Sequence, residues 1–343
     1  MGAMIVTGVA RFAAAACVVA VVSLSALGDR GNAAGPALVA RNDGAMPVVT
    51  PERPRSAQNP AYSPDGSRIV FTQFHNGYNI GPSGLFILDR SVGRITRLFD
   101  DEGNDNVNLP GSCWNGPREL ITFSSDREDR DEIWTISTQT GARFRVTRHA
   151  DGGDSLESSF SPDGDWIVFE VSKEMGGGQR AGTLWKVRAD GSDLTRLTGQ
   201  TAQWDDRQPN WSLRGDRVVF QRRPIGADNW SLYTMNPEDG TATPLLVSEY
   251  DHSDVAWSPD GRWVVFSSNE GNLPNPQIFV LSRKGGIPVR VTFDTRYSDS
   301  APSWSPDGAT IAFESHETDE SPASIWQIAV PRLPPGRRRP VRR

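Results

Sequence analysis

Cysteine and histidine are scarce in this chain of 343 residues, which holds two cysteines and four histidines. Cys17 lies in an apolar stretch near the start, so removal of that stretch would leave Cys113 as the single thiol and exclude an intramolecular disulfide. Cys113 stands next to Trp114 and is expected to be a small buried hydrophobe. Four scattered histidines argue against a histidine-rich metal centre, whose ligands must converge.

Two catalytic motifs are also missing. The chain contains no Gly-x-Ser-x-Gly segment, which excludes a hydrolase domain built on that nucleophile elbow. The segment that starts at His316-Glu317 lacks the second histidine of a zinc protease helix. The sequence therefore shows no assembled nucleophile, base or metal triad.

A sixfold repeat dominates the rest of the chain. In each copy an aromatic residue is followed by a tight turn and, nine positions later, by a phenylalanine. The six pairs are Tyr62/Phe71, Trp114/Phe123, Phe160/Phe169, Trp211/Phe220, Trp257/Phe266 and Trp304/Phe313. Successive leading aromatics are 46 to 52 residues apart. Self-similarity at this period is typical of a radial or solenoid array.

The turn inside each pair has its own chemistry. It reads Ser-Pro-Asp-Gly in four copies, at residues 63–66, 161–164, 258–261 and 305–308. Proline presets φ for a type I turn, aspartate bonds its own backbone, and glycine accepts a left-handed exit. The other two turns, at residues 115–118 and 212–215, differ in sequence but keep the nine-residue spacing.

Each turn leads into a β-branched, apolar strand, and a third and a fourth strand follow through glycine-containing hairpins. Four antiparallel strands in each of six repeats predict an all-β, six-bladed β-propeller. The sixth repeat ends after its third strand, near Val330. Residues 47–50 are expected to supply the missing fourth strand, so that the N-terminal strand closes the last blade and hides an open sheet edge.

This repeat resembles the TolB-type, WD-like propeller repeat, and the resemblance covers residues 46–330. It implies a six-bladed ring that binds other molecules at its faces. TolB carries an α/β domain ahead of its propeller, for which the residues before position 46 leave no room. A stand-alone propeller of the TolB-like type is therefore expected.

The first 28 residues have the features of a signal peptide, because Arg11 is followed by an apolar stretch and by small residues up to Gly28. Export with cleavage after Gly28 is expected. The alternatives are an uncleaved anchor, although the stretch is shorter than the roughly 20 residues that span a bilayer, or a lipid on Cys17. Residues 29–45 are expected to be a flexible lead, 46–330 the propeller, and 331–343 a disordered basic tail rich in proline and arginine.

Charge is distributed unevenly. The chain carries a net −6, residues 1–28 carry only Arg11 and the tail carries six arginines, which leaves −13 for residues 29–330. An acidic body of this kind disfavours nucleic acid as a partner. The tail is either a solvated end or a contact with anionic membrane lipid or polymer.

Candidate binding residues come shortly before the leading aromatics. They are Asn59, Glu157, Gln208, Asp254, Asp206, His252 and Asp299. In a propeller these segments converge at one mouth of the central channel, where they would form a ring of negative potential suited to a cation or a basic peptide segment. The plainer alternative is that aspartate and asparagine recur here because turns recur.

These features predict an exported, non-enzymatic scaffold of the cell envelope, periplasmic or extracellular, that binds a protein or peptide at a propeller face. A monomer is expected, without a cofactor other than a cation attracted to the channel, and no metal ligands are assigned. The alternative is a metal-dependent polysaccharide lyase or hydrolase, in which His252 would meet the mouth carboxylates around a metal ion. A subunit that supports a separate catalytic chain is a third option.

Overall fold

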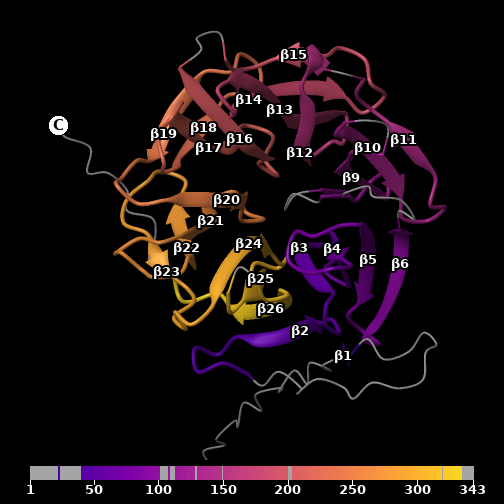
Figure 1. Ribbon diagram of the computed structural model, residues 1–343, viewed down its shortest axis with the longest axis vertical. Coiled ribbons are helices and arrows are strands. Elements are labelled where there is room, and N and C mark those ends of the chain that lie inside the picture. Colours follow the sequence, from indigo (N-terminus) through magenta and orange to yellow (C-terminus); the bar gives the residue numbers. More distant parts are fainter. Residues whose placement is uncertain are drawn as a thin grey trace, which may run out of the picture.

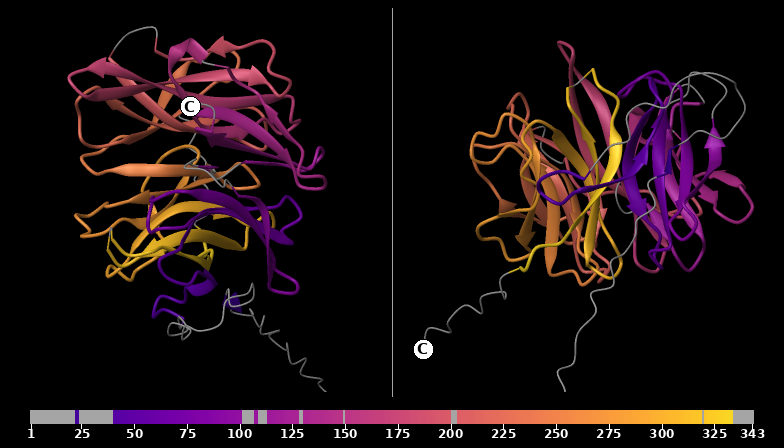
Figure 2. Two further views of the ribbon diagram at one scale, coloured as in Figure 1. Left: turned by 45° about the vertical axis from the view of Figure 1, so that its right-hand side comes forward. Right: turned by 90° about the horizontal axis from the view of Figure 1, so that it is seen from below.

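Six antiparallel sheets are arranged as blades around a common axis (Figure 1). The computed structural model describes residues 22–23, 40–100, 107–108, 113–127, 130–148, 150–199, 203–318 and 320–333. The strands run between the two faces of the ring (Figure 2). The predicted all-β, six-bladed propeller with four antiparallel strands per blade is confirmed. Within the described ranges, no helix has the length and apolar character needed to cross a membrane.

Blades 1 to 3 use strands in chain order. Blade 1 consists of β3 (Ser56–Tyr62), β4 (Arg68–Phe74), β5 (Ser83–Asp89) and β6 (Arg94–Asp100). Blade 2 has two short inner strands, and consists of β7 (Val107–Asn108), β8 (Trp114–Asn115), β9 (Leu120–Ser125), β10 (Glu132–Ser137) and β11 (Arg143–Arg145). After the 3₁₀ turn η1 (Ala150–Gly152), blade 3 consists of β12 (Asp154–Phe160), β13 (Trp166–Gly176), β14 (Gln179–Arg188) and β15 (Thr195–Arg196).

Blades 4 to 6 follow the same order up to the last strand. Blade 4 consists of β16 (Trp204–Trp211), β17 (Val218–Pro224), β18 (Ser231–Met235) and β19 (Ala242–Leu246). Blade 5 consists of β20 (His252–Trp257), β21 (Trp263–Ser268), β22 (Gln277–Ser282) and β23 (Val289–Arg290). Blade 6 consists of β24 (Ser298–Trp304), β25 (Thr310–His316), β26 (Ser324–Ala329) and, from the start of the chain, β2 (Met46–Thr50).

The ring closes as the repeat pattern predicts. Strand β2 pairs antiparallel with β26, with Val49 opposite Ile325, and this completes the last blade. Strand β1 (Val22–Ser23), inside the predicted signal peptide, pairs in parallel with β2. The other residues of that peptide, and the tail beyond residue 333, lie outside the described residues.

The packed structure begins earlier than expected. The flexible lead was predicted to reach residue 45, but Arg41 and Ala45 are both buried. Ala45 packs against the apolar core between blades 5 and 6, and Arg41 forms buried ion pairs. The prediction was wrong for residues 41–45 because it relied on composition. Small and polar residues are typical of flexible segments, and nothing in the sequence indicated the buried partner of Arg41.

The core is a ring of inter-blade clusters rather than one central mass. One fully buried phenylalanine per blade anchors it: Phe71, Phe123, Phe169, Phe220, Phe266 and Phe313. The cluster between blades 1 and 2 joins Val70 and Leu85 to Trp114 and Phe123. Cys113 belongs to the same cluster, as predicted, and burial raises the pKa of its thiol to about 12. Because neighbouring blades share each cluster, a blade cannot fold alone.

The Ser-Pro-Asp-Gly turns adopt the geometry that their residues favour. In the first, the Ser63 hydroxyl donates to Asp65 over 2.6 Å and accepts from the Arg68 amide over 2.9 Å. Gly66 has a φ of 72°, which other residues rarely adopt. A Cβ on Gly66 would lie 3.5 Å from Pro306 in the turn of blade 6. Turns of neighbouring blades therefore pack against one another at one face of the ring.

Candidate functional site

A β-bulge interrupts the inner strand at the same repeat position in five blades. The pairing register shifts there, and the bulged residue has a positive φ between 47° and 53°. The five residues are Asn59, Glu157, Gln208, Asp254 and Ala301. A left-handed backbone is uncommon outside glycine and costs free energy. Its recurrence at one position indicates a feature that the fold maintains, as is usual for bulges near functional sites.

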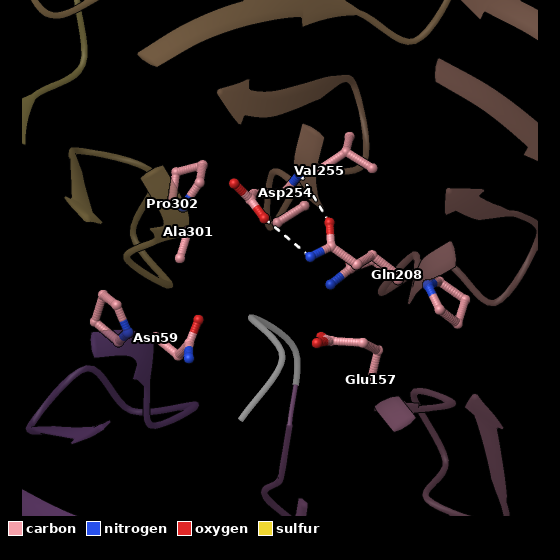
Figure 3. Close-up of a pocket in the computed structure, with 11 residues that line it drawn as sticks. Asn59, Glu157, Gln208, Asp254, Val255, Ala301 and Pro302 are labelled. Carbon is pink, nitrogen blue, oxygen red and sulfur yellow. Dashed lines mark hydrogen bonds between the residues drawn. The ribbon is translucent and has the colours of Figure 1, made fainter. Parts of the chain in front are cut away.

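The bulged residues line one pocket on the propeller axis (Figure 3). Asn59 lies on one side of it and Gln208 and Glu157 on the other, with Asp254 next to Gln208. The pocket volume is about 30 Å³, which admits one or two water-sized groups. The bulges fall near the middle of the inner strands, so the pocket lies inside the channel and not at the mouth where the sequence placed it. Four of the seven predicted residues are thus brought together.

The pocket has its own hydrogen bonds. The Gln208 amide nitrogen donates to Asp254 Oδ1 over 3.0 Å, and the Asp254 backbone amide donates to Gln208 Oε1 over 3.0 Å. The Ser267 hydroxyl donates to Asp254 Oδ2, also over 3.0 Å. Gln208 therefore links blade 4 to blade 5 and fixes the orientation of the Asp254 carboxylate.

A second set of polar side chains holds three of the five bulges from the preceding blade. The Asn59 amide donates to Glu314 over 2.8 Å, and the Asp254 amide donates to Gln221 over 3.3 Å. Glu170 accepts in the same way from the backbone of Gln208. These bonds satisfy the backbone donors that a bulge releases from the strand ladder.

Sequence reasoning missed this second set, although the repeat carried a signal for it. The residue directly after each core phenylalanine is polar in all six blades: Thr72, Ser124, Glu170, Gln221, Ser267 and Glu314. All six are buried. A polar residue at a fixed place in an otherwise apolar strand needs a partner. For Glu170, Gln221 and Glu314 the partner is a bulge of the next blade, whereas Ser267 bonds to Asp254 in its own blade.

Acidic side chains cluster around the pocket. Burial, with the charges of Asp254 and Asp131, raises the pKa of Glu157 to about 7, although Arg207 offsets part of the effect. Burial also raises the pKa of Glu170 to about 8, again against Arg207. Both carboxyls are therefore partly protonated near neutral pH.

Glu314 completes this acidic group. Burial and the charge of Asp254 raise its pKa to about 7, although it accepts from the Asn59 amide. Its other donors are the Tyr78 hydroxyl at 3.0 Å and the Ser300 hydroxyl at 3.1 Å. Tyr78 belongs to the loop between β4 and β5, so this loop helps to position the carboxyl that holds the Asn59 bulge. A bound cation would lower the pKa values of all these carboxyls.

Three predicted residues do not line the pocket. Asp206 is fully buried in blade 4 and accepts from Arg222 over 2.6 Å and 2.9 Å. Asp299 is fully buried in blade 6 and pairs with Arg41. His252 is fully buried in blade 5, with one ring nitrogen 2.8 Å from Ser248 Oγ and the other 2.8 Å from Ser268 Oγ. Burial lowers the pKa of His252 to about 4, so the ring is neutral at physiological pH.

The remaining histidines do not assemble a metal centre in the described structure. His316 packs against the Tyr78 ring at a tilt, with ring centroids 4.3 Å apart, and bonds to the Thr318 carbonyl over 2.8 Å. His75 is half-buried in the loop after β4, and His149 lies outside the described residues. Among the residues that the structure describes, no three of His, Cys, Asp and Glu are placed to hold a metal ion.

The blades, turns and bulged channel define a six-bladed propeller with TolB-like repeats. The family profile described as TolB beta propeller domain matches residues 208–331. An uncharacterised protein of Agrobacterium fabrum is 32% identical over 161 residues, which is 46% of this chain and 48% of that protein. A TolB homologue of Chlorobium chlorochromatii is 32% identical over 113 residues, 33% of this chain and 23% of that one. The chain spans about half or less of the length of these relatives.

Solved structures agree on the fold. TolB from Acinetobacter baumannii superimposes with a TM-score of 0.60 at 20% identity, over 77% of this chain and 61% of that one. The oligogalacturonate lyase from Vibrio parahaemolyticus gives a TM-score of 0.53 at 12% identity, over 86% of this chain and 96% of that one. Identities this low show the fold alone. Together with the profile match, they confirm the TolB-like six-bladed propeller that the repeat predicts.

Proposed function

We propose that this protein is an exported, non-enzymatic binding scaffold of the cell envelope, whose channel pocket receives a cationic side chain of a protein or peptide partner. The observation that carries the proposal is the pocket itself. Bulges that the fold maintains at a cost in free energy direct Asn59, Glu157, Gln208 and Asp254 at one small space. Their oxygen atoms offer acceptors for the three donors of an ammonium group.

The electrostatics favour a positive guest. The raised pKa values of Glu157 and Glu314 reflect carboxyls that are crowded together out of water. A cationic side chain would favour their ionised forms and form charge-assisted hydrogen bonds, which are stronger than neutral ones. A pocket of about 30 Å³ has room for the end of one side chain. The lyase alternative needs His252 beside the channel carboxylates, whereas both its ring nitrogens are engaged by serines inside blade 5.

Glu157→Gln combined with Asp254→Asn is expected to weaken binding of a lysine-rich decapeptide by roughly 100-fold or more, because two charge-assisted interactions are lost. Isothermal titration calorimetry at pH 7.5 measures the effect, with Ca²⁺ as a second, inorganic probe. Both substitutions preserve side-chain shape, so the bond from Gln208 to position 254 remains possible.

The matched control removes the same charge elsewhere. Asp190→Asn with Asp239→Asn neutralises two exposed hairpin carboxylates that bond only to their own turns. This variant is expected to bind the decapeptide like the unaltered chain. Equal affinity of the pocket variant and the control would refute the proposed site.

Export and the wider partner interactions rest on the sequence together with the TolB-like fold. The segment 1–28 supports export to the periplasm or the exterior, with cleavage after Gly28. The net charge of −13 between residues 29 and 330 supports a basic protein partner over nucleic acid. The six arginines of the tail support an additional contact with anionic lipid or polymer.

A further inference from the structure

A guanidinium group from the start of the chain is buried in the last blade. Arg41 donates to both carboxylate oxygens of Asp299 over 2.8 Å each, although 258 positions separate the two residues. Its side chain is 2% exposed and that of Asp299 is 0% exposed. Ser315 Oγ accepts a further bond over 3.0 Å.

Three aromatic rings surround this guanidinium. The Arg41 Cζ atom lies 4.9 Å from the ring centroid of Tyr297, 5.5 Å from that of Trp326 and 5.8 Å from that of Phe313. An arginine desolvated between aromatic faces gains from cation–π attraction as well as from its forked bond to a carboxylate. We call Tyr297, Asp299, Phe313 and Trp326 the blade 6 pocket.

Blade 4 contains the same arrangement, built from its own residues. Arg222 donates to Asp206 over 2.6 Å and 2.9 Å. Its Cζ atom lies 5.2 Å from the ring of Trp204 and 5.1 Å from those of Phe220 and Tyr233. The two pockets occupy equivalent repeat positions, since each blade 6 residue follows its blade 4 counterpart by the same interval: Trp204/Tyr297, Asp206/Asp299, Phe220/Phe313 and Tyr233/Trp326.

The decisive difference is the source of the arginine. The blade 6 position equivalent to Arg222 is Ser315, whose short side chain cannot fill the pocket. Arg41 enters instead from the N-terminal segment, and the Ser315 hydroxyl donates to Asp299 over 2.6 Å beside it. Blade 6 has therefore kept the aromatic rings and the carboxylate but takes its guanidinium from another part of the chain.

Blade 5 shows what replaces the pair when no arginine is supplied. The equivalent positions hold His252 and Ser268, which bond to each other over 2.8 Å. This ring is neutral at physiological pH because burial lowers its pKa. At this repeat position blades 4 and 6 each have a buried carboxylate paired with a guanidinium. Blade 5 has no guanidinium here, and His252 stands in place of the carboxylate. This agrees with the high cost of an unpaired buried charge.

The N-terminal segment is fixed at a second point next to the pocket. Asp43 accepts from Arg41 over 2.9 Å and from the backbone amides of Phe293 and Asp294 over 3.0 Å and 3.3 Å. Five residues after Arg41, strand β2 begins to pair with β26. The arginine and the strand therefore dock on the same blade as one unit.

We infer that the blade 6 pocket is a guanidinium-binding site for a strand that docks on β26, and that residues 41–50 of the same chain are its ligand. The inference is independent of the channel function. On this inference, the ring closes when an arginine binds in the preformed blade 6 pocket and the strand that follows it pairs with β26. Binding combines strand addition to a sheet edge with a side-chain anchor.

Chemical complementation in the full chain tests this inference. Arg41→Ala is expected to lower Tm by about 5–10 °C, because it leaves Asp299 buried without its partner. Millimolar methylguanidinium chloride should then raise the Tm of this variant by several degrees, since it binds only the folded state, and should not raise that of the unaltered chain. Sodium chloride at equal ionic strength should have no such effect.

Two further variants keep the test specific. Arg296→Ala removes an exposed arginine of the neighbouring loop, which pairs with Asp294, and should not respond to methylguanidinium. Arg41→Lys keeps the charge without the fork, and should also have a lowered Tm if the pocket recognises guanidinium. If Arg41→Ala does not fold, the Tm of Arg41→Lys tests the inference instead.

Three outcomes would overturn the inference. They are an unchanged Tm in Arg41→Ala or Arg41→Lys, a failure of methylguanidinium to raise the Tm of folded Arg41→Ala, and the same response in Arg296→Ala. Light scattering of the unaltered chain adds a separate check. A monomer is expected, and a dimer that dissociates in Arg41→Ala would show that the segment fills the pocket of a second copy instead.

Discussion

A chain that begins at residue 51 is expected to melt about 8 °C below a chain that begins at residue 40. The longer chain keeps Arg41, Ala45 and strand β2, including the buried side chains of Val48 and Val49. Loss of these apolar contacts and of the Arg41 ion pair should cost on the order of 5 kcal/mol. For a domain of about 285 residues, whose entropy of unfolding is about 0.6 kcal/mol/K, that corresponds to a shift of about 8 °C.

The two chains form a matched pair, because both lack residues 1–39 and differ only in the closing segment. Differential scanning calorimetry measures the difference directly. The shorter chain also exposes the edge of β26, so it should aggregate at lower protein concentration. Equal melting temperatures would mean that β2 contributes nothing to ring closure.

The second large effect concerns pH. Folding raises the pKa of Glu314 to about 7 and that of Glu170 to about 8, against 4.5 for an ordinary glutamate. The folded state therefore holds protons that the unfolded chain has already released. This stability is fully present below about pH 4.5 and is lost as the pH rises through 7 to 8. Tm should fall between pH 5.5 and pH 8.5.

Glu314→Gln should remove part of this loss, on the order of 2 kcal/mol at pH 8.5, because the amide cannot ionise. It can still accept from the Asn59 amide, so the bulge keeps its partner. Thermal melts from pH 5.5 to 8.5 measure the change in slope. Asp239→Asn, at an exposed hairpin, is the control and should retain the original slope. A variant with an unaltered pH profile would contradict the raised pKa of Glu314.

The repeat was enough to predict the fold. Turn chemistry, strand pattern and a period of 46 to 52 residues all agree on the same blade, and agreement between local and global signals makes a prediction secure. The closing strand was found by the same logic, since the residues before β3 repeat the pattern seen before β24. Arg41 was missed because its partner, Asp299, lies at the other end of the chain.

The candidate site was predicted only in part, for a physical reason. Residues two apart in a regular strand point to the same side, so in an unbroken strand Asp206 would face the channel with Gln208. The left-handed bulge at Gln208 breaks this alternation, and Asp206 turns into the blade, toward Arg222. His252 and Asp299 precede the bulges at Asp254 and Ala301 and are displaced in the same way. The spacing of the repeats does not reveal a bulge by itself, so the positions of the bulges become clear only in the structure.

Proton release on ligand binding tests the central claim most directly. The channel carboxyl of Glu157, with a pKa raised to about 7, should be partly protonated at pH 6.5. A cationic guest in the pocket must displace those protons, so addition of the lysine-rich decapeptide in a pH-stat should release protons at pH 6.5 and none at pH 9. The Glu157→Gln, Asp254→Asn variant should release none at either pH. Binding without proton release, or equal release from the variant, would place the cationic group outside the channel and contradict this account.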